Sequence, residues 1–314
     1  MSRSFPLLLS VLLVLGLAIP GTAIAAVNTP VVACPVSPGE VRVPGGRFAM
    51  GMDRVLPEES RPREVDVPSF FMDRTEVTNA QFAAFVKATG YRTQAERGWA
   101  DRPQVPAALQ APGSVVFRAP SQPAAPADSW WVFTPGANWH HPEGPGSSIA
   151  QRLQHPVVHV TYDDALAYAH WAGRELPTEA QWERAARYGT APTAMLEPPR
   201  KADGSFAANT FQGDFPRHNT AADGYVGTAP VGCFGANPLG LYDLLGNVWE
   251  WTRDSYAATG VATAEPARIL KGGSYLCTEH FCARYRPAAR QPGTEDLGTS
   301  HIGFRTVRPR RAAH

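Results

Sequence analysis

The stretch LPTEAQWE at residues 176–183, read together with GNVWEW at residues 246–251, decides the fold. In the first stretch Thr178 and Gln181 form a capping box that opens a helix, and Trp182 begins an apolar face that continues to Gly189. The second stretch lies in the region from Gly204 onwards, which is rich in Gly, Asn, Asp and aromatic residues. This order predicts short helices followed by a C-terminal third dominated by irregular structure.

Two more capping boxes lie N-terminal to this stretch. Thr78 with Gln81 predicts a helix up to Gly90, and Thr161 with Asp164 predicts another that ends before Gly173. Strand signals are weaker: residues 41–50 predict a hairpin with its bend at 44–46, and residues 157–160 predict a strand. Residues 103–128 show no clear periodicity and predict a long surface loop.

Composition agrees with a loop-rich globular protein. The 314 residues include 28 Gly and 30 Pro, which favour turns, and 8 Trp and 14 Phe, which supply large apolar surfaces. Length alone allows one or two domains, and we expect one. Charged residues make up 18% with a net charge of +1, so the broad basic surface of a nucleic-acid-binding protein is not expected.

The N-terminus has the pattern of a secretory signal peptide. Arg3 precedes an apolar run at residues 7–19, and Ala23-Ile24-Ala25 is a small-x-small cleavage site. We therefore expect an exported protein, periplasmic or secreted. The expected organisation is a signal peptide at 1–25, an N-terminal extension at 26–40, one domain at 41–308 and a basic tail at 309–314.

Two other interpretations of the N-terminus stay open. A membrane anchor needs about 20 apolar residues, whereas Pro20 interrupts the run. A lipoprotein would use Cys34, which lies far from that run. No later segment is apolar enough to span a bilayer, so we expect no membrane span in the mature protein.

The chain has four cysteines, Cys34, Cys233, Cys277 and Cys282, which allow three pairings. In an exported protein Cys277 and Cys282 could form a disulfide. They could also bind a metal. Zinc normally takes four ligands, and only His280 lies near the pair in sequence, so a two-thiolate site better suits Cu(I).

The segments around this pair resemble a known family. KGGSYLC (271–277) and CARYR (282–286) closely resemble the active-site segment of formylglycine-generating enzymes. Further matches to that family are GANWHHPEGP (136–145), HPVVHV (155–160), LPTEAQWE, GLYD (240–243), GNVWEW and GFR (303–305). The resemblance covers residues 41–307. Several of these elements are shared by the wider superfamily, whereas the two cysteines with their Gly-Gly-Ser lead-in are specific to the activity.

The resemblance implies an α+β fold: a single irregular, loop-rich domain related to C-type lectins, with little regular secondary structure. It also implies a copper-dependent oxidase that uses O2 to convert a cysteine in a Cys-x-Pro-x-Arg motif of a sulfatase into formylglycine. Cys277 and Cys282 would bind Cu(I), and the substrate thiolate would be the third ligand. Ser274 matches an active-site serine, and the alternative is a turn serine after Gly272 and Gly273. The expected partner is an unfolded or extended sulfatase polypeptide, and the enzyme is expected to be a monomer.

Further residues are implied by the same resemblance. Two structural Ca²⁺ sites are expected. The alternative is that the carboxylates at these positions bind no metal and cap turns. Their ligands would be Asn209, Thr210, Asp223 and Tyr225 in one site, and Asp243, Gly246, Val248 and Glu250 in the other. Substrate binding is expected at Asp101, Trp139, Trp249, Arg284 and His301. His301 stands where the family often has Asn, and Phe281 where it often has Tyr. The vertebrate members' extra disulfide cysteines are absent, which leaves Cys34 and Cys233 for a structural bridge.

Two other functions remain open at this point. The chain could be an exported superfamily member that modifies another peptide or a cofactor precursor, or a non-catalytic lectin-like binding module. A reduced Cys277 and Cys282 pair distinguishes the expected oxidase from both.

Overall fold

The computed structural model describes residues 34, 36–52, 56, 59, 61–103, 105–120, 130–189, 199–260, 263, 265–279 and 281–309. The expected signal peptide, most of the N-terminal extension and the tail after Pro309 lie outside the described residues. No helix in the described part of the chain combines the length and the apolar character needed to cross a membrane.

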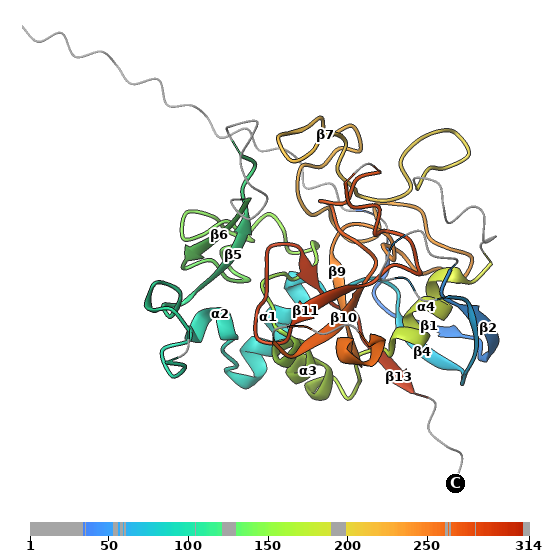
Figure 1. Ribbon diagram of the computed structural model, residues 1–314, viewed down its shortest axis with the longest axis horizontal. Coiled ribbons are helices and arrows are strands. Elements are labelled where there is room, and N and C mark those ends of the chain that lie inside the picture. Colours follow the sequence, from blue (N-terminus) through green and yellow to red (C-terminus); the bar gives the residue numbers. More distant parts are fainter. Residues whose placement is uncertain are drawn as a thin grey trace, which may run out of the picture. The chain divides into compact units, whose positions relative to one another are not determined.

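A four-stranded sheet runs through the C-terminal third (Figure 1). Its strands, in spatial order, are β11 (Gln291–Thr294), β10 (Ala267–Lys271), β9 (Trp249–Ser255) and β12 (Ile302–Gly303). β12 pairs parallel with β9, and the other pairs are antiparallel.

The remaining strands form smaller sheets. A three-stranded antiparallel sheet consists of β1 (Glu40–Val43), β4 (Phe70–Asp73) and β13 (Val307–Pro309). Antiparallel pairs are β2 (Gly46–Met50) with β3 (Arg63–Val67), β5 (Gly113–Phe117) with β6 (Trp131–Pro135), and β7 (Gly213–Asp214) with β8 (His218–Asn219). Because β1 and β13 both pair with β4, the two ends of the domain are fastened to the same strand.

Three of the four α-helices that the structure describes begin where the sequence predicts. The helices are α1 (Asn79–Thr89), α2 (Gln94–Arg97), α3 (Tyr162–Trp171) and α4 (Glu179–Arg187), with 3-10 turns at Ala107–Leu109 and Tyr256–Thr259. All three predicted capping boxes, at Thr78, Thr161 and Thr178, are present with both reciprocal hydrogen bonds. α2 carries a fourth box, which the sequence analysis missed. The expected mixed α and β fold with little regular structure is confirmed.

Strand β9 separates two hydrophobic clusters. Trp249 and Trp251 point into a cluster that includes α1 and α3, because alternate residues of a strand face the same side. Glu250 points the other way and accepts a hydrogen bond from the indole N–H of Trp182, which belongs to the second cluster. The predicted apolar face of α4 therefore packs on the four-stranded sheet, which we call the central sheet.

The predicted hairpin at 41–50 is wrong. Strands β1 and β2 both form, but β1 pairs with β4 while β2 pairs with β3. The chain changes sheets at Gly45, where a Cβ would lie 2.5 Å from the backbone nitrogen of Ser69. The glycine thus permits close backbone packing rather than a hairpin turn.

Two other local predictions also need correction. Residues 157–160 do not form a strand, because the N–H of Val157 bonds to Val77 and that of His159 bonds to Thr299, so no single partner strand exists. The predicted loop at 103–128 contains β5, which pairs with β6, although residues 121–128 lie outside the described residues. The C-terminal third is largely irregular, as expected, but the four-stranded sheet holds it together.

Candidate functional site

Two glycines bring Cys277 and Cys282 together. Gly272 and Gly273 follow β10 with φ of 97° and 74°, a region that other residues rarely adopt. A Cβ on Gly273 would lie 2.9 Å from the Cα of Tyr285. The segment after β10 can therefore pass directly against the segment that carries Cys282. The two sulfur atoms lie 3.1 Å apart, and both cysteines are free thiols.

The two thiols differ in their acidity. Burial raises the pKa of Cys277, which is only 1% exposed. The hydrogen bond from Cys277 lowers the pKa of Cys282 to about 6, against the effect of burial, and the Arg284 guanidinium 3.9 Å away lowers it further. The opposite directions of the two pKa shifts favour Cys282 as the thiolate of the pair and Cys277 as the thiol.

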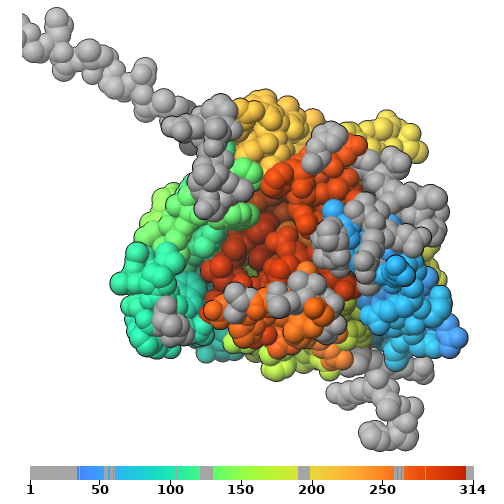
Figure 2. Space-filling model, viewed as in Figure 1, coloured from blue at the N-terminus to red at the C-terminus, as the bar shows by residue number. Residues whose placement is uncertain are grey.

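A cavity of about 220 Å³ opens beside the pair. Four predicted residues line it together with the cysteines: Trp249, Ser274, Arg284 and His301. Sequence reasoning missed four others, namely Trp130, Trp131, Phe215 and Gln291. Trp131 and Gln291 belong to β6 and β11, Trp130 directly precedes β6, and Phe215 lies between β7 and β8. No motif in the sequence marks them. In the space-filling view the orange and red C-terminal segment occupies the middle of one face, beside the green segment that contains β5 and β6 (Figure 2).

Ser274 has the features expected of a turn residue and also those expected of an active-site serine. Its hydroxyl accepts a hydrogen bond from the N–H of Leu276 at 3.2 Å, and its carbonyl accepts one from the N–H of Cys277. It therefore stabilises the turn that leads into Cys277. The same side chain is fully buried and lines the cysteine cavity.

His301 is a neutral member of the cavity wall. Burial lowers its pKa to about 3, and its ring lies 4.6 Å from the ring of Trp131. Its Nδ1 lies 2.6 Å from the hydroxyl of Thr299. This imidazole therefore offers a hydrogen-bonding group without a charge.

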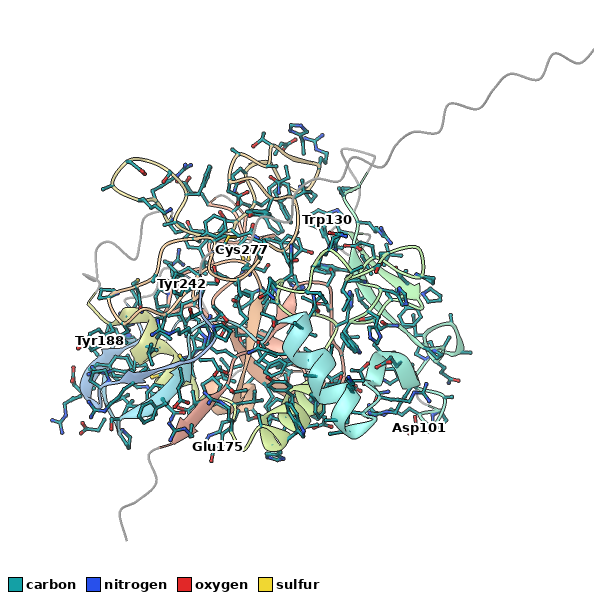
Figure 3. All side chains as sticks on the ribbon, turned by 180° about the vertical axis from the view of Figure 1, so that it is seen from behind. Asp101, Trp130, Glu175, Tyr188, Tyr242 and Cys277 are labelled. Carbon is teal, nitrogen blue, oxygen red and sulfur yellow. A yellow bond between two sulfur atoms is a disulfide. The ribbon has the colours of Figure 1, made fainter. Side chains whose placement is uncertain are left out.

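Two predicted substrate-binding residues lie elsewhere. Trp139 is 1% exposed and packs in the hydrophobic core against Phe82, with its indole N–H directed at Glu96. Asp101 is exposed in a turn, and Figure 3 shows it at the edge of the molecule, away from Cys277. The structure does not bring either of them to the cysteine pair.

Three residues of the first expected calcium cluster are linked by hydrogen bonds. Both oxygens of the Asp223 carboxylate accept backbone N–H groups, one from Thr210 and one from Tyr225. Asn209 is buried and its Oδ1 has no hydrogen-bond partner, while its Nδ2 donates to Gly227 and Asn247. Amide carbonyl and carboxylate oxygens are the types of donor that calcium takes.

The second cluster is more strongly charged. Burial, with the negative charge of Glu250 adding to it, raises the pKa of Asp243 to about 6. The Glu250 carboxylate itself is bonded to Arg305 and Trp182, with distances of 2.7–2.9 Å. Glu76 is fully buried in the same region and its Oε2 has no hydrogen-bond partner. In the described ranges no three His, Cys, Asp or Glu side chains group so as to hold a metal.

The other two cysteines are joined. Cys34 and Cys233 form a disulfide across 199 residues of sequence, with Cα atoms 4.9 Å apart. This bridge fastens the segment before β1 to the irregular region near the second calcium cluster. Cys277 and Cys282 are not joined to each other or to either of these cysteines. Structural disulfides are typical of proteins in oxidising compartments.

Comparison with known proteins places this site in a family. A family model described as "Sulfatase-modifying factor enzyme 1-like domain" matches residues 29–310. A relative from Mycobacterium tuberculosis named formylglycine-generating enzyme is 49% identical over 288 residues, covering 85% of this chain and 96% of the relative. A hercynine oxygenase from Mycolicibacterium smegmatis is 36% identical over 264 residues, covering 75% and 54% of the two chains.

A solved structure supports the fold alone. PvdO from Pseudomonas aeruginosa aligns with a TM-score of 0.58 and 24% identity, covering 86% of this chain and 94% of that one. Together with the matched family model, the 49% identity and the paired thiols, these likenesses show that the chain belongs to the sulfatase-modifying factor family, the family of the formylglycine-generating enzymes.

Proposed function

We propose that this protein is a formylglycine-generating oxidase that converts a cysteine of a sulfatase into formylglycine and so takes part in sulfatase maturation. The observation that carries the proposal is the pair of free sulfurs 3.1 Å apart in a cavity, within a chain of this family. Family membership alone would not be sufficient, because a relative with 36% identity is named hercynine oxygenase.

The proposed cofactor is Cu(I), held by Cys277 and Cys282. The donor set fits, because thiolate sulfur is a soft ligand and the lowered pKa of Cys282 keeps it deprotonated at neutral pH. A site with two ligands also leaves room for a substrate thiolate. When bound there, copper would supply the reactivity toward O2, the proposed co-substrate.

The chain's own residues would bind and orient the substrate. Arg284 stabilises the negative charge on the Cys282 sulfur. Ser274 presents a buried hydroxyl to the same cavity, which suits it to orient a small polar molecule. The walls formed by Trp130, Trp131 and Trp249 are suited to cover an extended peptide and to keep bulk water out.

The proposed substrate is an extended or unfolded sulfatase segment with the motif Cys-x-Pro-x-Arg. We also propose that the enzyme acts as a monomer and is exported, as the signal-like N-terminus indicates. The Cys34–Cys233 disulfide supports export, because such bonds persist in oxidising compartments.

Two Ca²⁺ ions are proposed as structural cofactors. The unpartnered Oδ1 of Asn209 and the Asp223 carboxylate support the first site, with the Thr210 and Tyr225 carbonyls. Asp243 and the carbonyls of Gly246 and Val248 would make the second. The Glu250 carboxylate is already bonded to Arg305, so its share in that site would be smaller than the resemblance alone implies.

Peptide oxidation tests the proposal directly. Copper-loaded and metal-free protein are each incubated in air with a Cys-x-Pro-x-Arg peptide and a thiol reductant. The reductant is required because reduction of O2 takes up two more electrons than oxidation of the cysteine side chain to the aldehyde supplies. Mass analysis should detect the aldehyde only with the copper-loaded protein, and a peptide with Ser in place of Cys should remain unchanged.

The 36% identical hercynine oxygenase motivates a second candidate, oxidation of a small sulfur or histidine-derived compound. Copper-loaded protein that leaves every Cys-x-Pro-x-Arg peptide intact would favour this second function over the first.

A further inference from the structure

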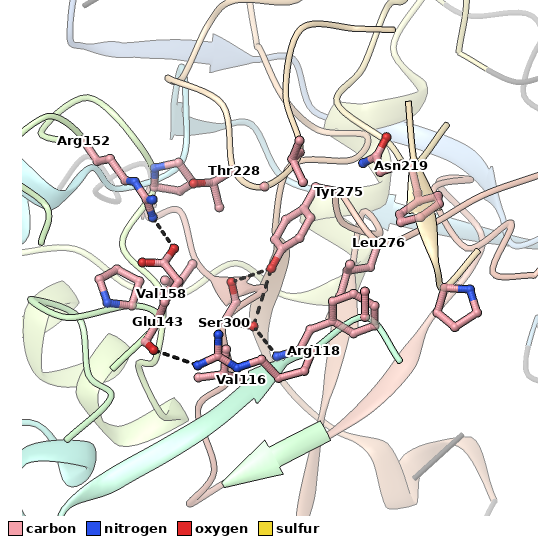
Figure 4. A pocket seen from close by; sticks show the side chains of 18 of the residues that line it. Val116, Arg118, Glu143, Arg152, Val158, Asn219, Thr228, Tyr275, Leu276 and Ser300 are labelled. Atoms are coloured by element: carbon pink, nitrogen blue, oxygen red, sulfur yellow. Dashed lines mark hydrogen bonds and ion pairs between the residues drawn. The ribbon is translucent and has the colours of Figure 1, made fainter. Parts of the chain in front are cut away.

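A second and larger cavity lies beside the cysteine site. It has a volume of about 600 Å³, and Arg118 and Arg152 are among the residues that line it (Figure 4). Arg217 is a third arginine in its lining. We call this second cavity the arginine cavity. Nothing in the proposed oxidation uses it.

The arginine cavity lies on a different face of β5 from the apolar groove that adjoins the cysteine site. Val116 lines the arginine cavity, whereas Val115 lines an apolar groove of about 610 Å³. The neighbouring segment beside β5 shows the same alternation: Ser300 lines the arginine cavity and Thr299 lines the apolar groove. Because neighbouring residues of an extended segment point to opposite sides, the two hollows are separated by this layer.

The lining of the arginine cavity is positively charged. Glu143 is the one acidic side chain among its described lining residues, and it is paired with Arg152. Arg217 is paired with Asp214, and Arg118 donates a hydrogen bond to the backbone carbonyl of Glu143 at 2.8 Å. In the part of the chain that the structure describes, no carboxylate pairs with Arg118. Its charge is therefore available to an anion.

Two residues that line this cavity carry buried polar atoms without a hydrogen-bond partner. Asn79 is 2% exposed, and its Oδ1 has no hydrogen-bond partner. The Nδ2 of Asn219 is likewise buried without a partner. Polar atoms that are buried in this way are costly unless a ligand or water satisfies them. The remaining surface includes Val116, Phe211 and Leu276, so the cavity combines polar groups with an apolar wall.

An aromatic ridge connects the arginine cavity to the cysteine pair. Phe281, next to Cys282, stacks on Phe215 with ring centroids 4.4 Å apart. Phe215 stacks on Phe117, next to Arg118, at 6.0 Å. Because an extended chain advances about 3.3–3.6 Å per residue, three or four residues cover this ridge. Leu276, next to Cys277, lines both cavities.

We propose that the arginine cavity binds a carboxylate side chain of the polypeptide substrate, three or four residues away from the reacting cysteine. The ligand chemistry is a carboxylate on a short apolar stem, held by Arg118 and set against the apolar wall. This proposal rests on the proposed function, since it names a further recognition element of the same substrate.

The test uses matched peptides. Each carries the intact Cys-x-Pro-x-Arg motif, with Glu or Gln placed in turn at the other positions within five residues of the cysteine. Charge-assisted hydrogen bonds are worth roughly tenfold in affinity. The wild-type enzyme should therefore show about a tenfold lower KM for Glu than for Gln at one position, with kcat unchanged. Equal KM values for Glu and Gln at every position would overturn the proposal.

Two variants identify the group responsible. Arg118→Gln should abolish the preference for Glu and leave the KM of the Gln peptides unchanged. The control is Arg47→Gln, which removes another exposed positive charge, on β2, where Arg47 is paired with Asp66. The control should keep the preference. If Arg118→Gln also keeps it, the assignment to this cavity is wrong.

Free glutarate distinguishes a small carboxylate from a substrate side chain. It should compete with the Glu peptide in the wild type and not in Arg118→Gln. Competition by glutarate with no advantage for any Glu peptide would overturn the assignment to the polypeptide. If no peptide is oxidised at all, the proposed function fails, and equilibrium binding of the Glu and Gln peptides still tests the cavity by itself.

Discussion

The two sulfurs of the cysteine pair should react at different rates. Cys282 is partly exposed with a pKa lowered to about 6, whereas Cys277 is buried with a raised pKa. Iodoacetamide added to metal-free, unreduced protein at neutral pH should therefore label Cys282 first. Peptide mapping by mass spectrometry checks this order.

The same experiment tests the pairing of all four cysteines. Cys34 and Cys233 should remain unlabelled until a reductant is added, because they form the disulfide. Recovery of a Cys277–Cys282 disulfide with Cys34 and Cys233 alkylated would contradict the structure and remove the basis of the copper site.

A histidine gives the protein a predictable dependence on pH. Burial, with the charge of Arg152 adding to it, lowers the pKa of His155 to about 4, and its Nδ1 lies 2.9 Å from the hydroxyl of Thr228. The unfolded chain therefore binds more protons than the folded chain below pH 6.5, and stability falls as pH decreases from 6.5 toward 4. The slope is at most about 1.4 kcal/mol per pH unit for this group.

The measurement is chemical denaturation at pH 7.5 and pH 5. His155→Gln should lose less stability than the wild type between these two conditions, by about 1–2 kcal/mol. An unchanged difference between the two pH values would mean that His155 is charged in the folded protein.

A sequence motif was sufficient to predict which residues lie around the cysteine pair. The lead-in to Cys277 and the residues after Cys282 identified the pair and its neighbours Ser274 and Arg284, all of which line one cavity. Trp131 and Phe215 line the same cavity without any local signal, because only the tertiary fold brings them there. Trp139 shows the converse: its motif matches the family, and its side chain is part of the core.

At the scale of elements, α4 is fastened to the central sheet through a buried charge cluster. Lys271 at the end of β10 is fully buried, and its Nζ lies 3.1 Å from Glu183 and 3.3 Å from Glu179 of α4. Removal of one partner of a buried pair typically costs about 3–5 kcal/mol, because the remaining charge is left uncompensated. Lys271→Met should cost about 3 kcal/mol, since Arg187 and Arg290 still face the two carboxylates.

An exposed ion pair provides the control. Arg253 is paired with Glu175 and both side chains are about half exposed, so Arg253→Met should cost about 0–1 kcal/mol. Both values come from urea denaturation. Equal small losses in the two variants would show that the Lys271 cluster does not hold α4 in place.

Helices were predictable here and strands were not, for a physical reason. A capping box satisfies the first N–H groups of a helix from within four residues, so Thr78, Thr161 and Thr178 mark helix starts without tertiary information. Strand partners lie far apart in sequence, because β4 pairs both with β1 near the start of the domain and with β13 at its end. The local alternation at 41–50 cannot encode such partners, which explains the wrong hairpin.

At the scale of the whole molecule, long irregular segments depend on cross-links. If calcium binds at Asp223 and Asp243, a chelator should lower the melting temperature of the wild type, because a ligand that binds only the folded state stabilises it by about 2.7 kcal/mol at a hundredfold excess. Asp223→Asn should show a smaller chelator effect. Asp66→Asn, which changes an exposed carboxylate on β3, should respond like the wild type. Identical melting curves with and without chelator would count against both calcium sites.

The central claim is that Cys277 and Cys282 are the copper-binding, catalytic pair, and two single variants test it most directly. Cys277→Ser and Cys282→Ser each replace a soft thiolate with a hydroxyl that Cu(I) does not accept as a ligand. The matched control, Cys34→Ser with Cys233→Ser, should lose about 2–5 kcal/mol of stability and keep its activity wherever it remains folded. The account predicts folded Cys277 and Cys282 variants that retain no copper and form no aldehyde from a Cys-x-Pro-x-Arg peptide, whereas oxidation of that peptide at the wild-type rate by either variant would contradict it.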